Sequence, residues 1–161
     1  MISLSILKKW LISMGSPPFF FKWASRLLPW FSPISFSILI IGLIWGVGFA
    51  PSDYKQGDVY RIIFVHVPSA ILGQSIYLMM AIFGSICLIW RAKLAGMFLR
   101  SAAPLGASFT LIALISGAVW GKPTWGTWWV WDARLTSTLI LFFLYVGIIG
   151  LYSSIDNKQK G

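Results

Sequence analysis

Residues 62–90 read IIFVHVPSAILGQSIYLMMAIFGSICLIW, an uncharged run that is long enough to cross a bilayer as a single helix. Three more uncharged runs reach the roughly 20 apolar residues that a spanning helix needs, at 27–52, 101–121 and 135–155. Backbone polar groups must be hydrogen-bonded inside hydrocarbon, and no run shows the strict alternation of a barrel strand. The sequence therefore predicts an all-α, polytopic membrane protein with four transmembrane helices.

Composition and charge support this class. Hydrophobic residues make up 58% of the 161 residues and charged residues only 11%, which excludes an ordinary soluble domain and a disordered chain. Nine of the 13 lysines and arginines lie on one predicted side of the membrane, at Lys8, Lys9, Lys22, Arg26, Arg91, Lys93, Arg100, Lys158 and Lys160. By the positive-inside rule this side is cytoplasmic and holds both termini. The net charge of +9 is therefore explained by basic residues on the cytoplasmic side of the membrane, and no nucleic-acid partner is predicted.

The chain is expected to have three parts. Residues 1–30 are an N-terminal cytoplasmic or interfacial segment, in which tryptophans sit at headgroup level and lysines contact anionic membrane lipid. Residues 31–155 form the membrane domain, and residues 156–161 form a cytoplasmic tail. The first span is expected from about Pro33 to Ala50, and the third is expected to close at Gly121-Lys122-Pro123. Gly117 and Gly121 have the four-residue spacing that lets two membrane helices approach closely.

The connection between the third and fourth spans is rich in tryptophan. Residues 120–137 read WGKPTWGTWWVWDARLTS, with four indoles, Trp125, Trp128, Trp129 and Trp131, in close succession. A plain aromatic belt at the membrane surface usually scatters its indoles. This density favours a platform on which a large, flat, apolar ligand docks, because indole faces contact planar rings at low conformational cost.

Charged residues around these indoles indicate that the ligand carries negative groups. Lys122 and Arg134 bracket the tryptophans, and Arg61 lies in the other loop of the same predicted face. Arg134 falls in the first turn of the fourth helix, where a cation opposes the helix dipole, so an anionic partner is inferred. Asp132 precedes that helix and is expected to be its N-cap, or to orient Arg134 or Lys122.

His66 is the only histidine and lies near the same predicted face. A lone histidine is often structural, but its place beside the tryptophan-rich connection favours a ligand role. A site built only from protein needs three or four metal ligands, and the chain has one cysteine, Cys87, at the far side and no glutamate. Haem brings four nitrogens and needs only axial ligands. His66 is therefore predicted to be an axial ligand of haem iron.

No catalytic constellation is present in the sequence. The chain contains no Gly-x-Ser-x-Gly elbow, no carboxylate pair, no phosphate-binding glycine loop and no His-Glu-x-x-His motif. The sequence predicts a binding or transport protein, not an enzyme.

Two segments carry a resemblance to a known family. Residues 120–137 resemble the tryptophan-rich "WWD" signature of the haem-handling proteins of cytochrome c maturation. Residues 53–70, DYKQGDVYRIIFVHVPSA, resemble the first outer loop of the haem exporter protein C family (CcmC). The resemblance runs from about Pro51 to Ile155, and the WWD signature alone would also fit the related haem lyase subunits.

The resemblance implies a specific function. The protein would bind haem b on the outer face of the bacterial inner membrane, or of its mitochondrial counterpart, and present it to the haem chaperone CcmE. It would work with the ABC transporter subunits CcmA and CcmB and with CcmD. His66 would be the first axial ligand, and the platform for haem and chaperone would comprise Trp125, Trp128, Trp129, Trp131 and Asp132. Trp120 is also expected to bind the cofactor. The haem propionates would pair with Arg61, Lys122 or Arg134.

The chain departs from the family pattern in one respect. Family members usually have six spans and a second axial histidine between the fifth and sixth, whereas this sequence has four predicted spans and one histidine. Three alternatives follow: a shortened form with one protein ligand, a remainder on another polypeptide, or a decayed gene. Two other functions stay open. One is a haem-free assembly or scaffold subunit that docks proteins on its tryptophans, and the other is a transporter that moves haem through its own bundle, which few polar residues beyond Gln74 would line.

Overall fold

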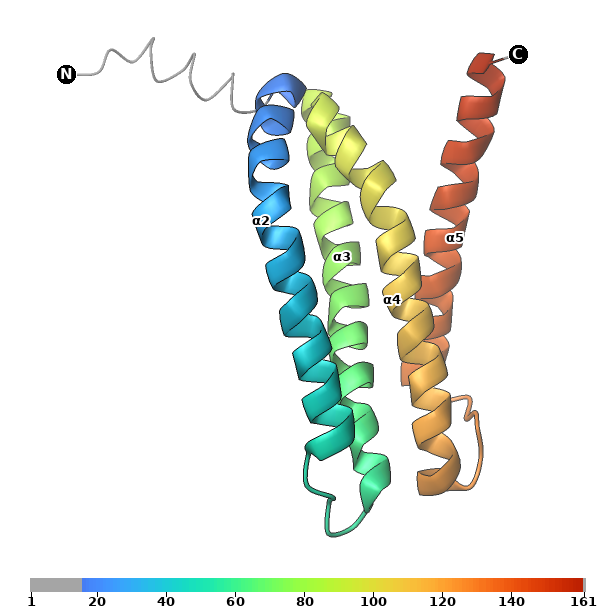
Figure 1. The fold of residues 1–161 in the computed structure, drawn as a ribbon. Coiled ribbons are helices and arrows are strands. Elements are labelled where there is room, and N and C mark those ends of the chain that lie inside the picture. The colour runs from blue at the N-terminus through green and yellow to red at the C-terminus, as the bar shows by residue number, and fades with distance from the viewer. Residues whose placement is uncertain (1–15, 161) are drawn as a thin grey trace, which may run out of the picture.

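Four long helices form the fold in the computed structural model, which describes residues 16–160, with side chains over 16–155. They are α2 (Pro17–Leu43), α3 (Ile63–Trp90), α4 (Lys93–Trp125) and α5 (Ala133–Lys160) (Figure 1). Each is long and apolar enough to cross a membrane. The predicted all-α class with four candidate spans is confirmed. The expected roles of Lys8, Lys9 and Trp10, and of the side chains of Lys158 and Lys160, lie outside the described residues.

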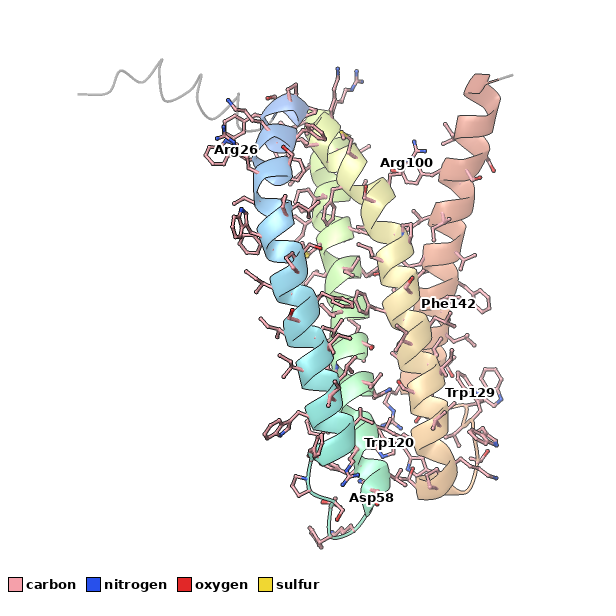
Figure 2. All side chains as sticks on the ribbon, viewed as in Figure 1. Arg26, Asp58, Arg100, Trp120, Trp129 and Phe142 are labelled. Atoms are coloured by element: carbon pink, nitrogen blue, oxygen red, sulfur yellow. The ribbon has the colours of Figure 1, made fainter. Side chains whose placement is uncertain are left out.

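The two longer connections of the bundle lie at one end. The loop from α2 to α3 and the connection from α4 to α5 are both at the bottom of Figure 1, opposite the turn between α3 and α4. Figure 2 shows Trp120 and Trp129 near this end and the basic residues Arg26 and Arg100 toward the other. The two segments singled out in the sequence therefore share one end of the molecule, and we call it the tryptophan end.

Two helix boundaries differ from the expected ones. Helix α2 begins at Pro17 and contains Pro29 and Pro33, where the sequence predicted a start near Pro33. Helix α4 continues through Pro123 to Trp125 instead of closing at Gly121-Lys122-Pro123. Proline is tolerated inside membrane helices because neighbouring helices, hydroxyl side chains and local changes of the helix can satisfy the backbone groups that it frees.

Two short helical turns complete the tryptophan end. The end of α2 widens into the π-helical turn η1 (Ile44–Phe49), closed by a 2.9 Å bond from the amide of Ala50 to the carbonyl of Trp45. The 3₁₀ turn η2 (Asp58–Ile62) then leads directly into α3. The second span thus starts where the sequence placed it, near Ile62, and Asp132 immediately precedes α5 as expected.

Helices α3, α4 and α5 pack around Tyr145, which is fully buried. Its ring lies over Gly106 of α4, where any side chain would collide with it, and its hydroxyl donates to the carbonyl of Gly73 of α3 at 2.7 Å. Small residues at such crossings let backbones approach closely, as is typical of membrane helices. Helix α2 has no buried residue. The core therefore belongs to α3–α5, and these helices also position the cavity described next.

Candidate functional site

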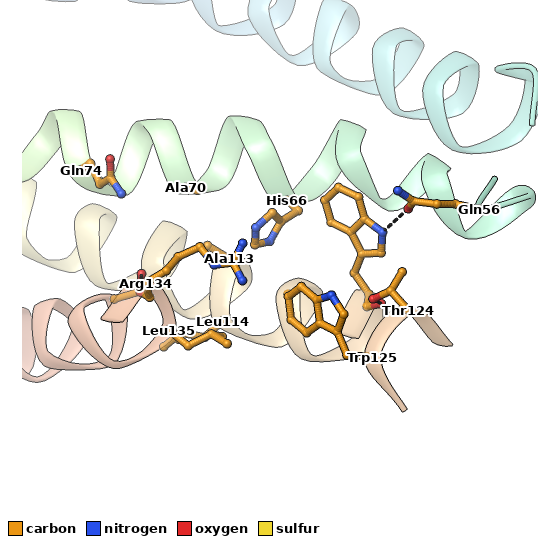
Figure 3. Close-up of a pocket in the computed structure, with 13 residues that line it drawn as sticks. Gln56, His66, Ala70, Gln74, Ala113, Leu114, Thr124, Trp125, Arg134 and Leu135 are labelled. Atoms are coloured by element: carbon orange, nitrogen blue, oxygen red, sulfur yellow. Dashed lines mark hydrogen bonds between the residues drawn. The ribbon is translucent and has the colours of Figure 1, made fainter. Parts of the chain in front are cut away.

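A cavity of about 410 Å³ opens between α3, α4 and the start of α5, near the tryptophan end (Figure 3). Its walls are mostly apolar, with Leu114 and Leu135 among them, and its polar groups come from different elements. Four residues predicted from the sequence line it: His66, Trp120, Trp125 and Arg134.

The imidazole of His66 lies against α4. His66 is in the first turns of α3, and its Nδ1 is 3.1 Å from Ser116 Oγ. A Cβ atom at Gly117 would come within 3.0 Å of the imidazole Cε1, so the ring fits because this residue has no side chain. Gly117 was predicted to let two helices approach closely, and the group that packs against it is the imidazole of His66, the candidate iron ligand.

Trp120 ties the cavity to the loop between α2 and α3. Its ring meets His66 edge-on, with centroids 5.7 Å apart, and its Nε1 donates to Gln56 Oε1 at 2.8 Å. Gln56 is placed by Asp53, whose Oδ2 accepts from the amides of Lys55 and Gln56, both at 2.9 Å. This turn of polar residues fixes the loop, and through it the indole that packs on the histidine.

Arg134 is held at the cavity wall by two neighbours. Its guanidinium lies 5.0 Å from the centre of the Trp125 ring and forms a 2.9 Å bond with Asp132 Oδ2. The other carboxylate oxygen, Asp132 Oδ1, accepts from the amide of Leu135 at 2.7 Å and caps α5. The amide of Leu135 and the adjacent Arg134 hold the pKa of the Asp132 carboxyl below its ordinary value. Asp132 thus both caps α5 and orients Arg134, as expected. Asp132 and Trp125 also offset the unfavourable position of the Arg134 cation in the first turn of α5, which was not predicted.

The other predicted tryptophans lie outside the cavity. Trp128 and Trp131 are 56% and 77% exposed on the connection between α4 and α5. Trp129 packs edge-on against Trp131, with centroids 5.4 Å apart, and its Nε1 is buried with no hydrogen-bond partner. The chain turns away after Trp125 because Gly126, with φ of 79°, ends α4. The expected platform is therefore divided into two cavity indoles, Trp120 and Trp125, and an outer surface formed by Trp128, Trp129 and Trp131.

Two of the three predicted cations also lie outside the cavity. Arg61 donates from Nε to the carbonyl of Ala50 at 2.8 Å and pairs with Asp58 at 3.3 Å, so it holds the loop between α2 and α3. Lys122 donates from Nζ to the carbonyl of Gly126 at 3.1 Å, beside the end of α4. The structure brings only Arg134 into the cavity with His66.

Several cavity residues were not singled out as site residues by the sequence. Gln56, Thr124 and Thr138 line the cavity, and Ser116 contacts His66 from α4. Serine and threonine are frequent in this chain, and nothing in the local sequence marks these positions as part of a site. They are brought together only by the packing of α3, α4, α5 and the loop between α2 and α3.

The arrangement suits a particular kind of ligand. The cavity offers one imidazole nitrogen, one guanidinium and two indoles between aliphatic walls. Within the described part of the chain, no three His, Cys, Asp or Glu side chains gather to hold a metal ion. This donor set fits a flat, apolar ligand that brings equatorial metal ligands of its own and carries carboxylates for a guanidinium to bind.

Comparisons with known proteins point in the same direction. Residues 10–161 match the family model described as "Heme exporter protein C". The chain is 50% identical over 151 residues to heme exporter protein C of Escherichia coli (strain K12), covering 94% of this chain and 62% of that protein. It is 46% identical to the proteins of the same name from Haemophilus influenzae, covering 95% of this chain and 62% of that one, and from Paracoccus denitrificans, covering 91% and 60%. The chain thus spans about 62% of the length of the first of these relatives.

Proposed function

This chain belongs to the haem exporter protein C family, and from that premise we propose that it binds haem b in the cavity beside His66. Its cargo would be presented on the outer face of the inner membrane during cytochrome c maturation. The observation that supports this most strongly is the meeting of His66, Arg134, Trp120 and Trp125 in one apolar cavity at the tryptophan end.

The four predicted residues that line the cavity each have a role in this proposal. His66 supplies a neutral ring nitrogen to the iron, which arrives with its four porphyrin nitrogens. Arg134 pairs with a propionate, since guanidinium and carboxylate form strong charge-assisted hydrogen bonds. Trp120 and Trp125 contact the porphyrin ring. Lys122 and Arg61 are weaker candidates for propionate partners because they do not line the cavity, whereas Arg134 does.

The exposed tryptophans support a separate docking role. Trp128 and Trp131 present large aromatic surfaces outside the cavity, and such residues are frequent hot spots in protein interfaces. We propose that the outer surface of Trp128, Trp129 and Trp131 receives the haem chaperone CcmE. The transporter subunits CcmA and CcmB and the small subunit CcmD would assemble with the same membrane domain, 31–155.

A haem-free scaffold is the second candidate function. It is favoured by the division of the tryptophans, because the surface of Trp128 and Trp131 stands apart from the cavity and needs no haem to bind a protein.

The absorption spectrum of the protein tests the first function against the second. The protein is purified in detergent from cells supplied with haem, beside His66→Ala, Trp120→Ala and a Trp128→Ala/Trp131→Ala double variant. We expect a Soret band that His66→Ala abolishes or shifts and Trp120→Ala weakens, whereas the double variant keeps the band and loses CcmE capture. Capture of CcmE by a wild-type protein with no Soret band would favour the scaffold.

A further inference from the structure

The imidazole of His66 faces α4, where the hydroxyl of Ser116 and the backbone carbonyl of Ala113 lie close to it. Nδ1 lies 3.1 Å from Ser116 Oγ. A neutral imidazole carries hydrogen on one nitrogen and a lone pair on the other, and only the lone pair can bind a metal. The direction of this hydrogen bond therefore decides which nitrogen is available.

Ser116 has one proton, and its neighbours show where that proton goes. Ser116 Oγ donates to the carbonyl of Ile112 at 2.7 Å and lies 3.3 Å from the carbonyl of Ala113. Both carbonyls can only accept. The 2.7 Å bond is shorter than the 3.1 Å contact with His66, so the proton is committed to the helix backbone. The hydroxyl oxygen is then left to accept a hydrogen from Nδ1.

The orientation of the ring supports the same assignment. A Cβ placed at Gly117 would lie 3.0 Å from Cε1, 3.4 Å from Nδ1 and 4.0 Å from Nε2, so Nε2 is the nitrogen turned furthest from α4 at this point. Figure 3 shows the imidazole projecting between α3 and α4 into the cavity. Trp120 packs edge-on against the ring and limits its rotation.

We propose that Ser116 is a positioning residue that fixes the neutral tautomer of His66 with Nδ1 protonated and leaves the Nε2 lone pair free for the iron of haem. The identity of the ligand rests on the proposed function. The tautomer itself is a property of the haem-free protein, so it is measured without haem.

The test compares two side chains of the same shape, in Ser116→Thr and Ser116→Val. Threonine keeps a hydroxyl that can bond the preceding turn of a helix, whereas valine replaces it with a methyl group. His66 is the only histidine, so ¹⁵N-labelled histidine gives one pair of ring nitrogen signals, read at a pH where the ring is neutral. We expect wild type and Ser116→Thr to show Nδ1–H. Ser116→Val should move the tautomer ratio about fivefold toward Nε2–H, the factor that corresponds to one typical hydrogen bond.

A haem titration of the same proteins separates this inference from the proposed function. We expect Ser116→Val to weaken haem binding about tenfold or more, the usual cost of losing a partner that orients a metal ligand, and Ser116→Thr to retain it. Circular dichroism confirms folding, and Ser116→Ala repeats the comparison without a branched side chain. An unchanged tautomer ratio in both Ser116→Val and Ser116→Ala overturns the inference. The expected ratios in proteins that bind no haem would leave it standing and remove the proposed function.

Discussion

At the scale of single residues, His66 and Asp132 at the tryptophan end act in different protonation states: His66 as a neutral imidazole and Asp132 as an ionised carboxylate. His66 is proposed to act through a lone pair, and its neighbours Ser116 and Trp120 hold the ring rather than neutralise it. Asp132 acts as a fixed carboxylate that caps α5 and holds Arg134. The two residues should therefore respond to acid in different ways.

Haem affinity is expected to fall as the pH decreases, because a protonated imidazole has no lone pair for iron. Once most of the His66 side chains are protonated, each further pH unit should weaken binding by roughly tenfold. Titrating haem into the protein over a pH series, followed by the Soret band, measures this. Binding that does not change with pH would exclude His66 as the iron ligand.

Asp132→Ala is expected to lower the melting temperature of the protein in detergent, because the first turn of α5 loses its cap. The folded protein holds the pKa of Asp132 below its ordinary value of 3.8, chiefly through the amide of Leu135. A lowered pKa means that this stabilisation is complete above the ordinary value and is lost as the pH falls through the folded one. The melting temperatures of wild type and Asp132→Ala should therefore converge in acid, and a constant difference down to that range would contradict the capping role.

At the scale of elements, the sequence predicted the four spans and the shared end of the two loops but misplaced two boundaries. The apolar runs are long and uncharged, so the existence of the helices was clear. The starts and ends were read from prolines, and Pro33 and Pro123 both lie inside helices. In a membrane helix, the carbonyl that a proline leaves without a donor can be satisfied by neighbouring helices or by local changes of the helix, which a reading of the local sequence does not include.

The same extension of α4 explains which site residues were predictable. Because α4 continues to Trp125, Trp120 and Trp125 lie in its last turns and line the cavity, while Trp128 and Trp131 follow the turn at Gly126 and lie outside it. The sequence identified the tryptophan-rich segment and His66, but it could not tell which indoles line the cavity and which lie outside it. The contact between Ser116 and His66 could not be predicted from the sequence, because it depends on the register of α3 against α4.

Gly117→Ala tests that register. The added methyl would lie 3.0 Å from Cε1 of His66 and displace the ring by a few tenths of an ångström. We expect haem binding to weaken by about tenfold, as when the orientation of a metal ligand is disturbed. The matched control is Gly147→Ala in α5, where the new methyl meets nothing within 4 Å. Equal effects of the two substitutions on the haem titration would show that the contact between Gly117 and His66 is unimportant.

At the scale of the whole molecule, stability and binding are located at different depths of the bundle. Tyr145 joins α3, α4 and α5, because its hydroxyl bonds the carbonyl of Gly73 and its ring lies over Gly106, and the cavity lies nearer the tryptophan end. The two properties should be separable by mutation.

Tyr145→Phe removes the bond to the carbonyl of Gly73 while keeping the ring over Gly106. We expect a loss of about 0.5–1.5 kcal/mol in the free energy of unfolding, with membrane proteins near the lower end of that range. Chemical denaturation in mixed micelles measures this loss, and haem affinity should stay within about twofold of wild type because the cavity lining does not change. A larger fall in affinity than in stability would show that the core and the cavity are coupled.

Labelling of single cysteines tests the proposed orientation in the membrane. In a Cys87→Ser background, Tyr54→Cys lies in the loop between α2 and α3, where Tyr54 is 88% exposed, and Lys93→Cys lies at the opposite end of the bundle. A membrane-impermeant maleimide added outside intact inner-membrane spheroplasts should label Tyr54→Cys and spare Lys93→Cys. The reverse pattern would place the tryptophan end in the cytoplasm and refute presentation on the outer face.

The burial of Tyr145 has a consequence for the route that a cargo can take. The cavity reaches Gln74 on α3 and Thr138 on α5, and Tyr145 fills the space between the three helices just beyond that depth. Within the described part of α3–α5, the packed core around Tyr145 lies between the cavity and the end of the bundle that carries the turn between α3 and α4. We therefore expect a haem molecule bound beside His66, as proposed above, to leave through the opening of the cavity or between the helices, and not through the core of α3–α5. Net movement in one direction must come from an acceptor that binds the cargo more tightly or from a partner that expends energy.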